Sequence, residues 1–184
     1  MIFWKNRIFQ IRPQKSERQE QRRGAGDVAL KLDKGHISED VNIFRYAVVL
    51  EYIGTQYAGS QIQPNQKTIQ SELENALQIV CRQKVKTIFS GRTDRGVHSK
   101  GQVVHFDLSQ KLDEYKFIAS VNAILPQDIS ISVVTEVSKD FHAQKSAKYR
   151  WYRYKILNKP TRSVWNKKES AHIWGDFDIE AMNK

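Results

Sequence analysis

The sequence predicts an α+β sandwich. From residue 43 onward, runs of strand length alternate with two segments of helical periodicity. Their order is strand, helix, strand, strand, helix, strand, strand, which is close to the split βαβ or ferredoxin-like pattern. A chain of 184 residues is long enough to bury a hydrophobic core in one such domain.

The first half of this pattern contains three strands and one helix. Tyr46–Tyr52 is a largely apolar run of strand length. Apolar residues recur at helical spacing over residues 69–80, and Thr68 is placed to cap the helix N-terminus. Val85–Phe89 alternates as a strand does, and Gln102–Leu108 is predicted as the next strand.

The second half contains one helix and two strands. Asp113 is placed to cap a helix that ends at Pro126. Ile129–Val137 and Tyr149–Leu157 are predicted as strands. Since alternate side chains of a strand point to opposite faces, we expect one face of residues 149–154 to lie in the core.

The composition changes near residue 43. Residues 1–42 mix charge, Gln and Gly, and we expect a mostly disordered basic extension. Its first twelve residues lack the continuous apolar stretch of a secretory signal, and an organelle presequence is the alternative to an unstructured extension. Residues 43–184 form the predicted domain.

Charge and cysteine content narrow the possible partners and compartment. The net charge of +10 favours a polyanionic partner. The single cysteine, Cys81, excludes an intrachain disulfide and fits the reducing cytoplasm, and we expect it to be a buried apolar residue. The five histidines show no metal-ligand spacing, so we expect no metal, and no apolar run reaches the roughly 18 residues of a membrane span.

The segment Gly91–Gln102 carries the most chemistry. It places the Asp94 carboxylate between Arg92 and Arg95, whose charges favour the ionised carboxylate. Glycines on either side allow a ligand to approach the backbone closely. These residues suit a nucleophile or base beside an anionic substrate, and a polar turn in which Asp94 caps backbone amides is the alternative.

The run GRTDRGVHSKGQVVHF, residues 91–106, resembles the signature of the TruA family of tRNA pseudouridine synthases. The resemblance implies that Asp94 is the catalytic carboxylate and that Arg92 fills the space left by a flipped-out uridine. We group His98 and Arg95 with the RNA-binding residues. Arg95 departs from the family pattern, which usually has a small residue there.

Two further segments resemble the same family. Residues 52–65 are similar to its first-strand region, and Ser60 stands where a Trp is usual. Residues 141–147, FHAQKSA, are similar to the family's FHARFSA segment. Gln144 replaces the customary Arg, and Lys145 restores charge beside it. We expect altered packing or substrate contacts at these positions.

Residues 139–168 predict an RNA-binding surface without help from the family. They hold ten Lys or Arg against one acid, Asp140, and five interleaved Tyr or Trp. Cations neutralise phosphates and aromatic rings stack on unpaired bases, so we expect Arg150 and Arg153 to bind RNA. The alternative is a solvated basic strand with buried aromatics. The resemblance implies that Tyr152 stacks on the target uracil.

The resemblance also implies a reaction and a substrate. The family isomerises uridine to pseudouridine, with neither metal nor organic cofactor, in the anticodon stem-loop of tRNA around positions 38–40. Family members continue beyond the point where this sequence stops, so we expect the C-terminal half to be missing. That leaves two hypotheses. One is an enzyme that is active alone or with the missing part supplied in trans, as a homodimer or with a complementing C-terminal half. The other is an inactive RNA-binding module.

Overall fold

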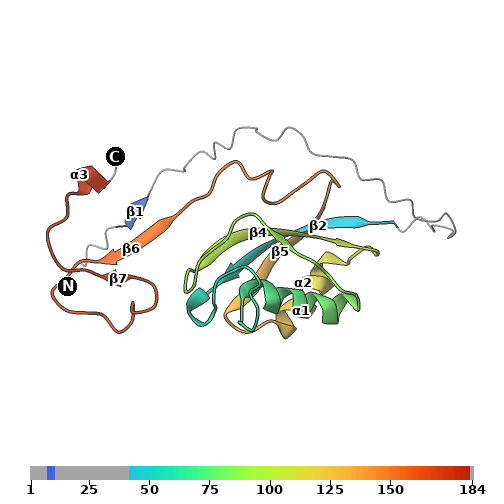
Figure 1. Cartoon of the computed structure of the whole chain (residues 1–184), viewed down its shortest axis with the longest axis horizontal. Coiled ribbons are helices and arrows are strands. Elements are labelled where there is room, and N and C mark those ends of the chain that lie inside the picture. The colour runs from blue at the N-terminus through green and yellow to red at the C-terminus, as the bar shows by residue number, and fades with distance from the viewer. Residues whose placement is uncertain (1–7, 11–41, 183–184) are drawn as a thin grey trace. The chain divides into compact units, whose positions relative to one another are not determined.

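The computed structural model describes residues 8–10 and 42–182 (Figure 1). The chain forms two compact units, one of residues 23–147 and one of residues 1–22 with 148–184. Residues 11–41 lie outside the described residues. The expected disorder of residues 1–42 and the expected division at residue 43 therefore stay predictions.

The first unit contains one antiparallel sheet of four strands in the order β3-β4-β2-β5. The strands are β2 (Phe44–Tyr52), β3 (Ile88–Phe89), β4 (Ser99–Leu108) and β5 (Ile129–Val137). The helices are η1 (Gly54–Gln56), α1 (Ile69–Cys81) and α2 (Glu114–Ile124). Because β4 lies between β2 and β3, the first strand-helix-strand unit is split, which confirms the predicted ferredoxin-like pattern.

Both long helices begin where the sequence predicts. The Thr68 hydroxyl accepts the backbone N–H of Ser71 at 3.1 Å, and the Ser71 hydroxyl accepts the Thr68 N–H at 3.0 Å. The Asp113 carboxylate accepts the N–H of Lys116 at 3.2 Å. Each cap satisfies an N–H that has no partner within its helix. No helix among the described residues is long and apolar enough to cross a membrane.

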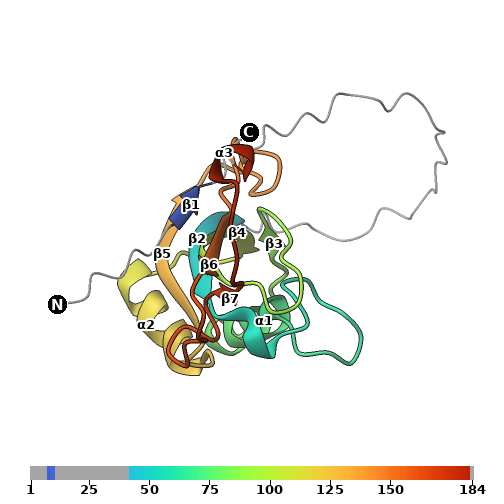
Figure 2. The ribbon, with the colours of Figure 1, turned by 90° about the vertical axis from the view of Figure 1, so that its left-hand side faces the viewer.

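The hydrophobic core lies between the sheet and the two helices, which cover the same face (Figures 1 and 2). Alternate residues of β2, among them Val48 and Leu50, are fully buried and pack with Leu73 and Leu77 of α1. Cys81 is a buried free thiol, as predicted. Burial disfavours the thiolate and raises the pKa of Cys81 to about 11.

One strand of this unit is shorter than predicted. The sequence suggests a strand over Val85–Phe89, and β3 contains only its last two residues. The Glu74 carboxylate accepts the backbone N–H of Thr87 at 2.8 Å, and the Gln70 side chain donates to the Thr87 carbonyl at 3.1 Å. Side chains of α1 therefore bind the backbone groups that a strand neighbour would otherwise take.

The second unit contains short strands and no buried residue among residues 148–182. A three-stranded sheet has the order β1-β6-β7, in which β6 is antiparallel to β1 and parallel to β7. The elements are β1 (Ile8–Gln10), β6 (Arg153–Leu157), β7 (Ala171–His172) and a single helical turn, α3 (Ile179–Met182).

The predicted strand over Tyr149–Leu157 is wrong for its first four residues, because β6 begins at Arg153. The predicted core face is wrong as well. Tyr152 is 50% exposed, and the other aromatic rings of residues 149–154 are more exposed still. The sequence alternates as a strand does, but among the described residues of this unit no apolar layer covers either face.

Candidate active site

The sheet brings two loops that are distant in sequence to one end of its central strands. Tyr52, the last residue of β2, lies opposite Ser99, the first residue of β4. The loop that follows β2 therefore leaves the sheet beside the loop that precedes β4. The first contains residues 53–67, and the second contains residues 90–98 with the GRTD motif. Both loops were singled out from the sequence, and the fold places them side by side.

Thr93 is the residue through which the GRTD loop is held. The Ser60 N–H donates to the Thr93 carbonyl at 2.9 Å, and the Thr93 N–H donates to the Ser60 hydroxyl at 2.8 Å. The hydroxyls of Tyr52 and Thr93 are 2.8 Å apart. Arg92 and Asp94, on either side of Thr93, are both exposed. The loop is thus fixed at its centre and presents a charged residue on each side.

Two glycines make this close approach of the loops possible. A Cβ atom on Gly54 would lie 2.0 Å from the carbonyl oxygen of Val97, so no other residue fits without moving the backbone. Gly59 has φ of +120°, and a Cβ there would lie 2.9 Å from the Thr93 carbonyl oxygen. The Gly54 N–H also donates to Nδ1 of His98 at 3.0 Å. We therefore call Gly54, Gly59, Ser60, Thr93 and His98 the loop clamp.

The charged residues of the motif do not pair with one another. No ion pair among the described residues joins Asp94 to Arg92 or Arg95. The Arg95 guanidinium donates instead to the Gln66 side chain at 3.1 Å. The adjacency of these charges in the sequence therefore does not produce a contact. His98 lies inside the loop clamp, a structural position that sequence reasoning did not foresee, and its RNA-binding role stays a prediction.

The FHAQKSA segment is anchored on β4 through a buried histidine. The Ala143 N–H donates to Nδ1 of His105 at 3.1 Å, and the His105 ring lies 5.0 Å from the ring of His142, centroid to centroid. Burial, together with the nearby Arg45 charge, lowers the pKa of His105. Lys145 follows this anchor and is exposed. Its side chain is therefore accessible to an anionic ligand.

The matched part of the chain contains both loops. Residues 48–144 match a family model described as tRNA pseudouridine synthase. The chain belongs to the tRNA pseudouridine synthase family. It is 39% identical over 141 residues to tRNA pseudouridine synthase A of Halalkalibacterium halodurans, and that match covers 76% of this chain and 54% of the relative. It is 42% identical over 139 residues to the protein of the same name from Shewanella amazonensis, with 76% and 53% covered.

These comparisons confirm the resemblance drawn from the GRTD motif. The chain spans about half the length of the curated pseudouridine synthases that it matches. The family match ends before residues 148–182, the unit that carries Arg150, Tyr152 and Arg153. Tyr152 and Arg153 are exposed there and Arg150 is partly buried. The expected contact of Tyr152 with a base at Asp94 stays a prediction.

Tyr57 stabilises the loop of residues 53–67, and the sequence does not predict this role. Tyr57, which is buried, donates its hydroxyl to the carboxylate of Asp128, and the Lys67 ammonium lies 5.1 Å from the centre of its ring. Burial and the Asp128 charge raise the pKa of Tyr57. Because Asp128 is 71 residues away, sequence spacing gives no signal for this pair. Its effect is to fix the loop that bears Ser60.

The described residues contain no group of three or more His, Cys, Asp or Glu side chains placed to hold a metal ion. The groups available for chemistry at the loop clamp are the carboxylate of Asp94 and the guanidinium of Arg92, both exposed. An exposed carboxylate on a fixed loop can act as a nucleophile or as a base.

Proposed function

We propose that this chain is a tRNA pseudouridine synthase that isomerises uridine to pseudouridine in the anticodon stem-loop, around positions 38–40. The observation that carries the proposal is the loop clamp, which fixes Thr93 from both sides and leaves Asp94 exposed. The relatives are named tRNA pseudouridine synthase A, and the matched residues include the whole clamp.

The reaction exchanges one bond to the ribose for another. The bond from N1 of uracil to C1′ breaks, the base turns, and a bond from C5 to C1′ forms. The proton on C5 is released and N1 gains one, so the atoms balance without an oxidant or a cofactor. We assign Asp94 the catalytic role, either by attack on the ribose or by removal of a sugar proton. Both routes need an ionised carboxylate held at a fixed position.

The neighbouring residues would bind the RNA. Exposing a stacked uridine costs a few kcal/mol, and Arg92 would offset part of that cost by filling the vacated space. Tyr152 would stack on the base. The remaining predicted RNA-binding residues would contact phosphates or support the loop, namely Arg95, His98, Lys145, Arg150 and Arg153.

A second candidate function is an RNA-binding module without turnover. It is favoured by the exposed aromatic rings of residues 149–174, which are interleaved with basic residues. Among the described rings of this segment, that of Trp165 is the most exposed, at 93%. For the enzyme, we propose that a homodimer partner or a C-terminal half contributes further residues to the site.

Turnover on tRNA separates the two functions. The full chain is incubated with unmodified tRNA transcripts that carry 5-tritiated uridine, alone and with the C-terminal half of a related synthase. We expect tritium release in at least one arm, and none from a transcript with cytidine at positions 38–40. Retained tRNA binding without release in either arm would instead establish the binding module.

A further inference from the structure

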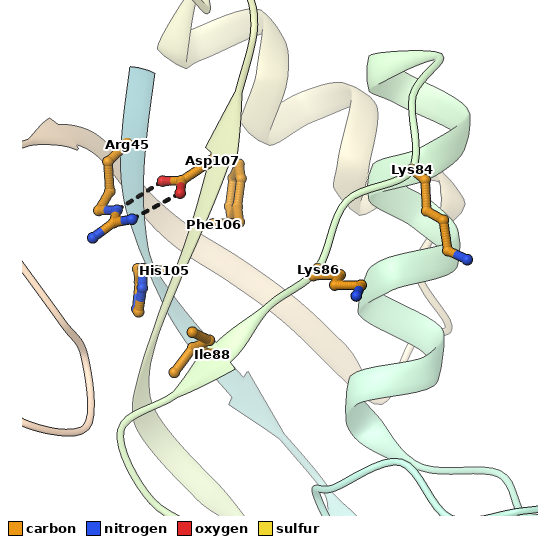
Figure 3. Close-up of a pocket in the computed structure, with 7 residues that line it drawn as sticks. All are labelled: Arg45, Lys84, Lys86, Ile88, His105, Phe106 and Asp107. Carbon is orange, nitrogen blue, oxygen red and sulfur yellow. Dashed lines mark hydrogen bonds and ion pairs between the residues drawn. The ribbon is translucent and has the colours of Figure 1, made fainter. Parts of the chain in front are cut away.

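A cavity of about 340 Å³ lies at the edge of the sheet, away from the loop clamp. Strand β3 pairs with β4 only at Val104 and His105, so from Phe106 to Leu108 this edge of β4 has no strand neighbour among the described residues. The cavity occupies this edge (Figure 3). Its lining residues are Arg45, Lys84, Lys86, Ile88, His105, Phe106 and Asp107.

The cavity carries more positive than negative charge. Arg45 donates two hydrogen bonds to the Asp107 carboxylate, each of 2.7 Å, and its third nitrogen donates to two backbone carbonyls. This pair is therefore internally neutralised and fixed. Lys84 and Lys86 are exposed, and neither forms an ion pair among the described residues. Two positive charges of the lining thus remain without a counter-charge.

His105 adds a neutral hydrogen-bond donor to the same lining. Its Nδ1 accepts the N–H of Ala143, which leaves the proton of the neutral ring on Nε2. The only carboxylate in the lining, Asp107, is engaged by Arg45. Among the described residues, the charged side chains of the lining that form no ion pair are therefore both cations, Lys84 and Lys86.

We propose that this cavity binds a phosphate group of the RNA backbone, at a contact separate from the Asp94 site. The ammonium groups of Lys84 and Lys86 and the imidazole N–H of His105 suit the anionic oxygens of a phosphate. Ile88, which is partly exposed, supplies an apolar surface against which a ribose can lie. That the ligand is RNA rests on the proposed function, and the net charge of +10 is consistent with it.

The salt dependence of tRNA binding tests this contact. Lys84→Ala and Lys86→Ala are each compared with Lys116→Ala. Lys116 is an exposed lysine on α2, and its substitution removes the same charge. The affinity of the full chain for an unmodified tRNA transcript is measured between 50 and 200 mM salt. A lost phosphate contact reduces the slope of log affinity against log salt by about 0.7–0.9. We therefore expect the Lys84 and Lys86 variants to lose about threefold less affinity over this range than wild type.

Lys116→Ala should keep the wild-type slope. If the slope of log affinity against log salt equals that of wild type in all three variants, the proposal is overturned. Binding of uridine monophosphate that is lost in the Lys84 and Lys86 variants, with an unchanged tRNA slope, would also overturn it in favour of a free-nucleotide site. The readout is binding. If the variants show the slope change but the chain has no turnover, only the proposed enzyme activity is refuted. Normal turnover with an unchanged slope refutes only this contact.

Discussion

The two units of the chain use similar sequence patterns with different results. In residues 42–147, alternating residues of β2 and β4 form strands whose inner side chains are buried under two helices. In residues 148–182, a comparable alternation leaves every residue at least partly exposed, and the strand forms only from Arg153. Alternation thus specifies a strand when a second apolar layer covers one of its faces.

The same contrast separates the proposed roles of the two units. The first unit holds Asp94 on a loop that is fixed through buried contacts at Ser60 and Tyr52. The second presents aromatic and basic side chains to solvent. A carboxylate that acts on one bond needs a fixed position, whereas stacking and phosphate contacts tolerate more adjustable side chains.

The largest expected effect concerns stability. Leu77 is fully buried in the core, and Leu77→Ala should destabilise the chain by about 2–5 kcal/mol through lost contacts and a cavity. Trp165→Ala, in the second unit, should change the free energy of unfolding by less than about 0.5 kcal/mol, since Trp165 is 93% exposed. Denaturant unfolding of the two variants measures both. A comparable loss in Trp165→Ala would show that the second unit buries what the structure exposes.

A matched pair of glycines tests the loop clamp. Gly54→Ala must displace the backbone at Val97 and should cost about 1–3 kcal/mol. Gly101→Ala meets no atom within 4 Å and should be neutral or stabilising by up to about 1 kcal/mol. Thermal unfolding and exchange of the Thr93 amide report the two effects. If both variants behave alike, the close approach of the loops is not what fixes Thr93.

A third substitution tests the role of the second unit in binding. Tyr152→Ala should weaken binding to a stem-loop with an exposed uridine by about 1–3 kcal/mol, because one stacking contact is lost. Binding to a fully paired stem should change little. Fluorescence titration with both RNAs measures the difference. Equal losses on the two RNAs would remove the stacking role.

The sequence predicts features that depend on neighbouring residues and misses those that depend on residues far apart in the chain. Helix starts at Thr68 and Asp113 are local signals and are correct, because a cap depends on residues three positions apart. The shortened β3 depends on Glu74 and Gln70 binding the backbone of Thr87, and the loop clamp depends on Ser60 meeting Thr93, 33 residues away. No short-range pattern encodes such pairs. The motif located the loop, and the fold supplied its partners.

The smallest expected effect is a pH dependence at the edge cavity. Hydrogen bonding to Arg45 lowers the pKa of Asp107 below its ordinary value of 3.8. A lowered pKa stabilises the fold above the unfolded value, and this stabilisation is lost as the pH falls through the folded value. The Tm difference between wild type and Asp107→Asn should therefore be present at pH 7 and shrink below about pH 4. A difference that stays constant with pH would contradict the charge pairing.

Turnover by Asp94→Asn is the most direct test of the central claim. The variant keeps the size of the side chain and removes its charge. Asp140→Asn makes the same change at another exposed aspartate of the first unit. The variants are tested under the condition, alone or with the C-terminal half of a related synthase, in which wild type releases tritium from 5-tritiated uridine in tRNA. The rate of Asp94→Asn should fall about 10²–10⁴-fold, while the variant still binds tRNA. Asp140→Asn should retain the wild-type rate. Tritium release by Asp94→Asn at the wild-type rate would contradict the assignment of the catalytic carboxylate.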